Sequence, residues 1–464
     1  MLPEGFSSRI VAVGGTGVGA TDYTWPLFPD GKGTVATPDG GWILACNHEV
    51  FDFQTIGESA GGASSIRFDS GGSILDAYPI LEGSHSNSRG ATTPWGTWLS
   101  CQEAHQGDGR IWECDPTGDS PAVPRNALGV RTHGSVAVDP LGGHCYMTEA
   151  HRDGRLYRFR MLDESLSGAA LADGLLEAMV VDPDGGVSWI PVPDPSGTVA
   201  PPRIQAADGF VTPMGGGVWV HDGSLIFTTA LDDRVHAVDL ANQRHWVLWD
   251  GSGHRQPLVG IGDLTVAPAS GDLFVAEDRG DMELVLVGTE GLVAPFCRMV
   301  GDDHRLSAVT GPCFDPSGTR LYISSLRGRG EALVRDVVEA IDWGDGAEGR
   351  HVGVTYEVSG PFRSGPSLDA ASGSTTTVQP TASPATTVVR DATAMTAGTT
   401  TQTAVTTFPP TVPPTTTLDR ASGQVDMPDS GTGGAALGLG AVAVLALGAG
   451  VVALRRRSSD GSGG

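Results

Sequence analysis

Six segments of this chain share one pattern: a turn, then a short apolar strand, then small or acidic residues. Four of them are GHCYMTEA (143–150), GSLIFTTA (223–230), GDLFVAED (271–278) and TRLYISSL (319–326). Two more are TPWGTWLSC (93–101), which ends in Cys101, and GWILACNHE (41–49), whose spacing from the others is less regular. The spacing is 48 residues from Cys101 to Glu149, from Thr229 to Glu277 and from Glu277 to Ser325. A period of 40–50 residues with several short strands in each unit predicts an all-β, six-bladed β-propeller.

The ends of the repeat indicate how the ring closes. The first strand, SRIVAVG (8–14), is expected to complete the last blade together with HVGVTYEV (351–358). From Glu149 to Thr229 the spacing is 80 residues. We therefore expect an insertion outside the repeat near residues 160–205.

Equivalent positions of a propeller surround one axis, so residues distant in sequence meet there. By the spacing, Cys101, Glu149, Thr229, Glu277 and Ser325 are equivalent, and Glu49 and Glu103 lie close to them. Several carboxylates that face one axis repel one another unless cations lie among them. The segment TPWGTWLSCQEAH (93–105) is therefore interpreted as a metal-ligand segment at the end of an inner strand. Two alternatives remain: polar residues line a water-filled channel, and Cys101 is a small buried apolar residue.

Composition divides the chain into four parts: a propeller (1–358), a Thr/Pro/Ser-rich stalk (359–432), an apolar segment (433–454) and a basic tail (455–464). The stalk has too little apolar surface to fold and is predicted to be disordered. Residues 434–454 contain no charge and are long enough to cross a bilayer as a single helix. Because RRR (455–457) follows at once, the tail is expected in the cytoplasm and the body outside the cell.

Anchoring has a second interpretation. MPDSG (427–431) resembles a sortase-type sorting signal, so attachment to the cell wall competes with a plain membrane anchor. No signal peptide is visible at the N-terminus, because MLPEGFSSRI has neither a basic region nor an apolar run. The expected location is the extracellular face of the membrane or the cell wall.

The charge of the chain argues against a nucleic-acid partner, and its cysteine spacing argues against a structural zinc site. Acidic residues outnumber basic ones 54 to 29, for a net charge of −25, which excludes a nucleic-acid partner because phosphate backbones need a basic surface. The charge is compatible with secretion and with hard cations such as calcium. The six cysteines form no CxxC, so a structural zinc site is not expected, and their spacing cannot give a disulfide pairing.

Several motifs together resemble one known family. They are TPWGTWLSCQEA (93–104), NHE (47–49), GRIWECDPTGD (109–119), VAEDRGDM (275–282) and TGPCFDPSGTRLYISSLRG (310–328). Over about residues 33–330 the chain resembles PhoX-type alkaline phosphatases and their actinobacterial relatives. The resemblance implies a six-bladed propeller, export, a cluster of ferric iron (Fe3+) and calcium (Ca2+), and hydrolysis of phosphate monoesters. Its implied partners are phosphorylated small molecules.

The resemblance also implies a site. Cys101 would be an iron ligand, and the acids implied as metal ligands are Glu49, Glu103, Glu149, Glu277 and Asp278. Ferric iron accepts thiolate and carboxylate, and calcium accepts carboxylate oxygens. Arg279, beside these acids, is a candidate phosphate contact, with a surface or ion-paired arginine as the alternative. Other catalytic residues are not assigned, and no organic cofactor is expected.

Four positions depart from the family pattern. Gln102 replaces an acid after the cysteine, Gly134 and Gly216 stand where acids are usual, and Ser88 replaces a cysteine. Two functions therefore remain in competition: a surface-anchored, metal-dependent phosphatase, and a catalytically weak or inactive propeller that serves as a binding module. A third, another calcium-dependent hydrolase such as a lactonase, is disfavoured by the TPWGTWLSC block.

Overall fold

A computed structural model describes residues 1–364, apart from 51–60, 105, 164, 166, 254–255, 289–290, 302–303, 305–306 and 329–351. Most of the predicted stalk, the apolar segment and the tail lie outside the described residues. In the described part no helix is long and apolar enough to span a membrane.

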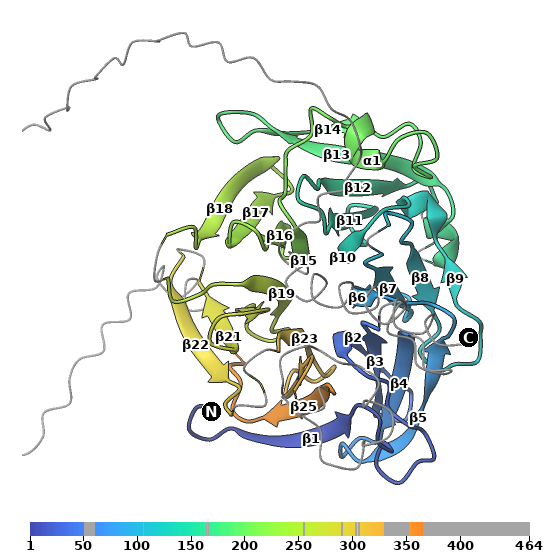
Figure 1. The fold of residues 1–464 in the computed structure, drawn as a ribbon, viewed down its shortest axis with the longest axis vertical. Coiled ribbons are helices and arrows are strands. Elements are labelled where there is room, and N and C mark those ends of the chain that lie inside the picture. The colour runs from blue at the N-terminus through green and yellow to red at the C-terminus, as the bar shows by residue number, and fades with distance from the viewer. Residues whose placement is uncertain are drawn as a thin grey trace, which may run out of the picture. The chain divides into compact units, whose positions relative to one another are not determined.

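The described residues form six antiparallel sheets around a common axis, and a six-bladed β-propeller is confirmed (Figure 1). The innermost strands, in blade order, are β2 (Pro29–Ala36), β6 (Asn87–Thr92), β10 (His133–Asp139), β15 (Gly215–His221), β19 (Ile261–Val266) and β23 (Val309–Phe314). Each contacts the innermost strand of the next blade, and β23 contacts β2. Blades 2 and 5 therefore face each other across the axis.

Three further layers of strands lie outside this ring. The second strands are β3 (Trp42–His48), β7 (Trp98–Gln102), β11 (His144–Glu149), β16 (Ser224–Thr229), β20 (Leu273–Glu277) and β24 (Arg320–Ser325). The third strands are β4 (Gly62–Phe68), β8 (Ile111–Cys114), β12 (Leu156–Met161), β17 (Arg234–Asp239), β21 (Glu283–Val287) and β25 (Val354–Ser359). The outer strands are β5 (Ile74–Leu81), β9 (Val123–Pro124), β13 (Gly174–Val181), β18 (Arg244–Asp250), β22 (Val293–Arg298) and β1 (Ser7–Val13).

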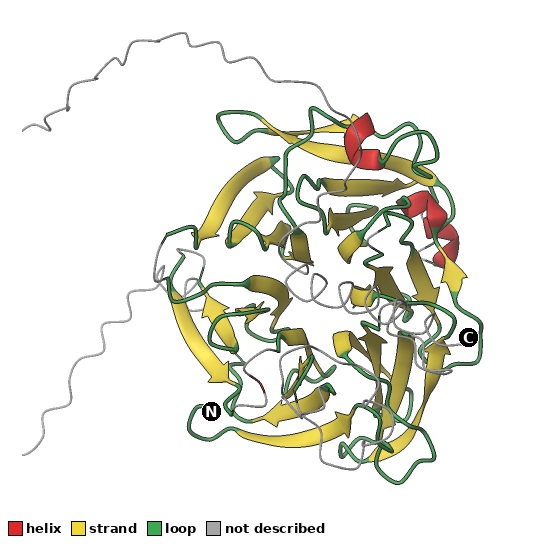
Figure 2. Cartoon of the chain, in the orientation of Figure 1, coloured by secondary structure: helices red, strands yellow, loops and turns green. Residues whose placement is uncertain are grey.

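Helices in the described part are short, as Figure 2 shows. They are η2 (Asn126–Leu128), η3 (Gly168–Leu171) and α1 (Pro202–Gln205). Blade 3 has a fifth strand, β14 (Val187–Pro191), paired with β13. The predicted insertion at 160–205 is therefore corrected: it contains the end of β12, the outer strand β13 and the added strand β14, and only the rest lies outside the sheet.

Apolar side chains fill the spaces between blades, which explains why the strands read as apolar runs with little alternation. A sheet with neighbours on both faces buries both sets of side chains. Trp98 and Cys114 of blade 2 pack on Ala45 of blade 1, whereas Leu99 and Cys101 pack on blade 3. Equivalent clusters join blades 3 and 4, 4 and 5, 5 and 6, and 6 and 1.

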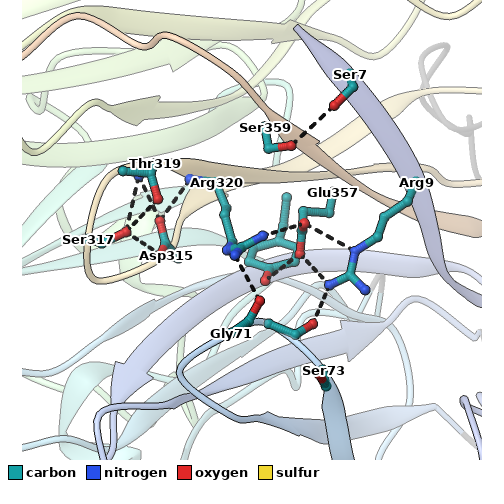
Figure 3. Close-up of polar contacts among 12 residues, drawn as sticks. Ser7, Arg9, Gly71, Ser73, Asp315, Ser317, Thr319, Arg320, Glu357 and Ser359 are labelled. Carbon is teal, nitrogen blue, oxygen red and sulfur yellow. Dashed lines mark hydrogen bonds and ion pairs between the residues drawn. The ribbon is translucent and has the colours of Figure 1, made fainter.

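The ring closes as the sequence predicts, because β1 pairs antiparallel with β25. Figure 3 shows the polar contacts that join these strands to β24 and blade 1. The buried Glu357 accepts hydrogen bonds from Arg9 (Nε 3.1 Å, Nη2 2.7 Å), from Arg320 (Nη1 3.0 Å) and from the Tyr322 hydroxyl (3.0 Å). Both arginines also donate to carbonyls of the turn at 71–72 in blade 1. One carboxylate therefore ties the first strand, the last strands and the first blade together.

Candidate functional site

Every innermost strand carries a β-bulge near its start, after the first residue in five strands and after the second in β23. The bulge residues are Asp30–Gly31, Ser88–Arg89, Gly134–Ser135, Gly216–Gly217, Gly262–Asp263 and Gly311–Pro312. A bulge bends the strand and redirects a side chain. The six bulges therefore bring twelve residues to one end of the axis.

Glycine at the bulges allows the innermost strands to approach one another closely. A Cβ on Gly31 would lie 2.6 Å from the Cα of Arg89 in the next blade. Gly311 has a φ of 54°, and a Cβ there would clash with the carbonyl of Asp30. Side chains at these positions would push the strands apart. Because glycine lets the strands approach, the charged residues of the other bulges lie close to one another.

A repeated hydrogen bond identifies the positions that are equivalent in all blades. The residue after each second strand donates its N–H to the carbonyl of a residue just before the innermost strand. These residues are Glu49, Glu103, Ala150, Ala230, Asp278 and Leu326. Three of the six are acids, and they belong to blades 1, 2 and 5.

The predicted set of equivalent residues requires two corrections. The first residue of each innermost strand pairs with His48, Gln102, Glu149, Thr229, Glu277 or Ser325. Gln102, not Cys101, therefore belongs to the set. Neighbouring residues of a strand point to opposite faces of the sheet, so the Cys101 side chain lies on the other face from Gln102. In addition, these residues end the second strand of each blade, one layer outside the strand that lines the axis.

The charged residues that do meet are here called the axial cluster: Asp30, Glu49, Arg89, Glu103, Asp263, Asp278 and Arg327. Arg89, from blade 2, lies at its centre. Its Nη1 is 3.6 Å from Oε2 of Glu103 in the same blade. Its Nη2 is 3.2 Å from Oδ2 of Asp278, and its Nε is 4.0 Å from Oδ1 of Asp263, both in blade 5. The Arg89 side chain thus spans the axis between opposite blades.

A second arginine lies beside this centre. Arg327 follows β24, and its Nη2 is 3.2 Å from Oε2 of Glu49. The Arg327 side chain is 28% exposed, against 10% for Arg89, so Arg327 is the guanidinium of the cluster that solvent reaches more readily. Ser88 donates to Oδ2 of Asp30, and the buried Lys32 donates to the backbone carbonyls of Asp30 and Thr310.

Burial and mutual repulsion perturb the carboxyl groups of the axial cluster. Burial raises the pKa of Glu49 to about 8, although Arg327 acts in the opposite direction. Burial likewise raises the pKa of Glu103 to about 7 and the pKa of Asp263 to about 6, against the effect of Arg89. Burial alone would lower the pKa of Arg89, but Asp278, Asp263, Asp30 and Glu103 together raise it above its usual value. Five carboxyl groups face two guanidiniums and one ammonium, so acid is in excess.

The remaining predicted ligands lie apart from this cluster. Cys101 is fully buried in the apolar cluster between blades 2 and 3, with Leu99 and Ile111, and burial raises the pKa of its thiol. Glu149 is fully buried and accepts hydrogen bonds from the Tyr157 hydroxyl (2.8 Å) and Arg203 (3.0 Å).

Glu277 organises the turn that follows its own strand. It accepts hydrogen bonds from the backbone N–H groups of Val259 (3.2 Å), Asp281 (3.1 Å) and Glu283 (3.1 Å). Burial raises the pKa of Glu277 to about 7.

Arg279, the candidate phosphate contact, is 54% exposed, donates to the Ala230 carbonyl (2.9 Å) and lies 3.7 Å from Asp233. The structure therefore brings together Glu49, Glu103 and Asp278, and leaves Cys101, Glu149 and Glu277 in other environments.

The residues present do not fit a complete cluster of iron and calcium. Among the described residues, no group of three or more His, Cys, Asp or Glu side chains is arranged to hold a metal ion. The thiol points into apolar packing, and Arg89 occupies the space between Glu103 and Asp278. The carboxylate oxygens alone are the donors that calcium prefers. The iron-ligand role of Cys101 remains a prediction. All six cysteines lie in the described part and are free.

Sequence reasoning missed Asp30, Arg89, Asp263 and Arg327. The first three share a signal that could have found them: a charged residue beside a glycine near the start of a strand, in PDGKG, SRGAT and GIGDL. Such a residue reads as part of a turn until the bulge is known. Arg327 gave no comparable signal.

Comparisons with known proteins give distant solved structures and one family model. Among solved structures, a gluconolactonase from Xanthomonas campestris is 12% identical, with a TM-score of 0.38, over 72% of this chain and 86% of its own. A protein of unknown function from Bacteroides thetaiotaomicron is 11% identical, with a TM-score of 0.44, over 76% of each chain. At these values neither likeness bears on function. No curated protein matches the chain.

The family model of alkaline phosphatase PhoX matches residues 59–213. This segment runs from β4 of blade 1 through blade 3 and contains Arg89, Cys101, Glu103 and Glu149. The resemblance to the PhoX alkaline phosphatases is therefore confirmed over residues 59–213 of this chain.

Proposed function

We propose that this chain is a phosphatase that hydrolyses phosphate monoesters and that the axial cluster is its site. The observation that carries the proposal is the PhoX match over residues 59–213, because this segment contributes Arg89 and Glu103 to the cluster. Buried, charged side chains with perturbed pKa values gather at functional sites, which supports the same location.

Two residues of the cluster have the chemistry that a phosphate ester requires. A guanidinium binds two phosphate oxygens at once, and Arg327 is the partly exposed one. Glu49 lies 3.2 Å from Arg327, next to the place where the bound phosphoryl group would lie. In this proposal water attacks phosphorus, the bond from phosphorus to the alcohol oxygen breaks, and the Glu49 carboxyl gives its proton to that oxygen. The proton that the attacking water loses then returns Glu49 to its protonated form, so the products are the alcohol and inorganic phosphate. Because the complete iron and calcium cluster does not fit, no step is assigned to a metal.

The test is hydrolysis of p-nitrophenyl phosphate by the purified full chain. Arg327→Ala should lower kcat/KM by at least about tenfold, the effect of losing one charged contact to the transition state. Arg158→Ala is the matched control, since Arg158 is paired with Glu177 at 2.7 Å on the outer part of blade 3. The assays are run with a chelator and with added calcium and ferric iron, the ions that the resemblance implies. Absence of hydrolysis under all these conditions would refute the phosphatase.

The alternative function, a binding module on the same scaffold, is favoured by one observation. Arg89 lies at the centre of the acids, and Gln102, Gly134 and Gly216 stand where the family has further acids. A module of this kind would bind a phosphate monoester without turnover. Isothermal titration with p-nitrophenyl phosphate, together with a null hydrolysis assay, would distinguish it from the enzyme.

We also propose that the propeller is displayed on the outside of the cell. The proposal rests on the uncharged run 434–454 and the arginines at 455–457, all outside the described residues. Protease added to intact cells should release the propeller by cleavage between residues 365 and 432. Protection of the propeller in intact cells would refute this orientation.

A further inference from the structure

We propose that Arg89 is a built-in counter-cation of the axial cluster, which holds blades 2 and 5 together across the axis in place of a bound metal ion. The proposal departs from the metal centre that the family resemblance implies. It concerns stability and metal dependence, so it can fail without affecting the proposed hydrolysis.

The first argument is geometric. One guanidinium is hydrogen-bonded to Asp278 at 3.2 Å and lies within ion-pair distance of Glu103 (3.6 Å) and Asp263 (4.0 Å). A calcium ion needs six to eight oxygen ligands at about 2.3–2.6 Å. An ion bound by these same oxygens would have to occupy the space that the guanidinium fills. Arg89 in this position and such an ion are therefore mutually exclusive.

The second argument is electrostatic. The side chains of Arg89, Glu103 and Asp263 are only 10%, 11% and 10% exposed. Buried carboxylates are strongly destabilising unless an opposite charge lies among them. Arg89 supplies that charge to Glu103 within blade 2 and, across the axis, to Asp263 and Asp278 of blade 5. The pairs with Asp263 and Asp278 therefore also link two blades that share no sheet.

The third argument is that the backbone of Arg89 is fixed. Nδ2 of the fully buried Asn47 donates to the carbonyls of Ser88 (2.7 Å) and Arg89 (3.0 Å). Asn47 is itself oriented by Nε1 of Trp98, which donates to its Oδ1 (2.8 Å). Gly31 of the first blade packs directly against the Arg89 Cα, because a Cβ on Gly31 would lie only 2.6 Å from that atom. The bulge is thus held rigidly, and the guanidinium is directed at the acids.

The consequence concerns the variant without the guanidinium. Asp30, Glu103, Asp263 and Asp278 would then face one another without a central cation, and Oδ1 of Asp30 already has no hydrogen-bond partner among the described residues. Such a set of oxygens is the type that binds calcium. Arg89→Ala should therefore convert a metal-independent propeller into one that calcium stabilises.

The test is the melting temperature of the full chain in excess EDTA and in millimolar calcium chloride. Wild type should melt at the same temperature in both. Arg89→Ala should melt about 5 °C or more lower in EDTA and regain much of the loss in calcium, since a ligand that binds only the folded state raises Tm. Arg89→Lys keeps the charge and should remain insensitive to calcium. Arg158→Ala should lose the same stability in both solutions.

Two outcomes would overturn the proposal. One is a wild type whose Tm falls on chelation by about 5 °C or more, and the other is an Arg89→Ala protein that calcium does not stabilise. If Arg89→Ala does not fold in either solution, the metal content of the wild-type protein tests the proposal instead. Elemental analysis of the purified chain should then find less than one calcium and less than one iron per molecule, and stoichiometric metal would refute the counter-cation.

Discussion

Removal of the Glu357 charge should destabilise the closure of the ring without changing the native fold. Glu357 is 3% exposed and accepts four hydrogen bonds from Arg9, Arg320 and Tyr322. Glu357→Gln keeps the shape of the side chain but replaces one acceptor oxygen with an NH2 donor. That donor would face Arg9 Nη2 and the Tyr322 hydroxyl, which both donate to the carboxylate in the native protein.

The magnitude follows from these four bonds. A hydrogen bond to a charged group contributes about 1.5–3 kcal/mol, against about 0.5–1.5 kcal/mol for a neutral one. Arg9 is 44% exposed and Arg320 26% exposed, so solvent screens part of their attraction. Glu357→Gln should therefore lower the free energy of unfolding by about 2–3 kcal/mol. Glu357→Ala, which leaves Arg320 and Tyr322 without their acceptor, should cost about 3–5 kcal/mol.

Urea unfolding followed by tryptophan fluorescence measures this loss. The midpoint should fall while the m-value stays that of wild type, because the native fold is retained. Asp39→Asn is the control, since its ion pair with Arg67 joins side chains that are 48% and 44% exposed. That substitution should change the free energy of unfolding by less than about 0.5 kcal/mol. A Glu357→Gln protein as stable as wild type would refute the role given to this carboxylate.

Three further predictions concern pH, packing and the axial bulges. Burial alone would raise the pKa of Glu357, but Arg9, Tyr322 and Arg320 lower it below its usual value. Its contribution should therefore be complete above pH of about 4.5 and disappear as the pH falls through the lowered pKa, so wild type and Glu357→Gln should converge in acid denaturation curves. Cys101→Ala should cost about 1 kcal/mol in urea unfolding and Cys101→Ser about 2 kcal/mol, because a hydroxyl would be placed in an apolar cluster. A visible absorption band that both substitutions abolish would instead identify Cys101 as an iron ligand. Gly262→Ala should destabilise by about 1–3 kcal/mol, because the new methyl group would clash with the Asp278 carboxylate; an unchanged urea midpoint would contradict this packing.

The blade number and the closure could be predicted from the sequence because each blade repeats the same local chemistry. Turn residues rich in Pro, Gly and Asp precede an apolar strand in every blade, and β1 pairs with β25 of the last blade. The register could not be predicted as well. The spacing is 47 residues from Gln102 to Glu149 but 48 from Thr229 to Glu277, because loops change length by one residue at little energetic cost.

The candidate site was predicted only in part, because the bulges and the side-chain contacts cannot be read from the repeat. Glu49, Glu103 and Asp278 were found because they follow recognisable strands, whereas Arg89 and Asp263 lie in bulges that no periodicity reveals. Glu149 and Glu277 occupy the repeat position that was expected. Their carboxylates are nevertheless engaged by Tyr157, Arg203 and backbone N–H groups, and only the three-dimensional contacts show this.

The central claim is that a guanidinium of blade 2 is bound by acids of blade 5 across the propeller axis, and a double-mutant cycle between Arg89 and Asp278 tests it most directly. The free energies of unfolding of wild type, Arg89→Ala, Asp278→Ala and the double variant give the coupling energy. Their contact is 3.2 Å, with Arg89 10% and Asp278 33% exposed, so we expect a coupling of about 1–2 kcal/mol. Single effects that add to within about 0.5 kcal/mol would contradict the claim.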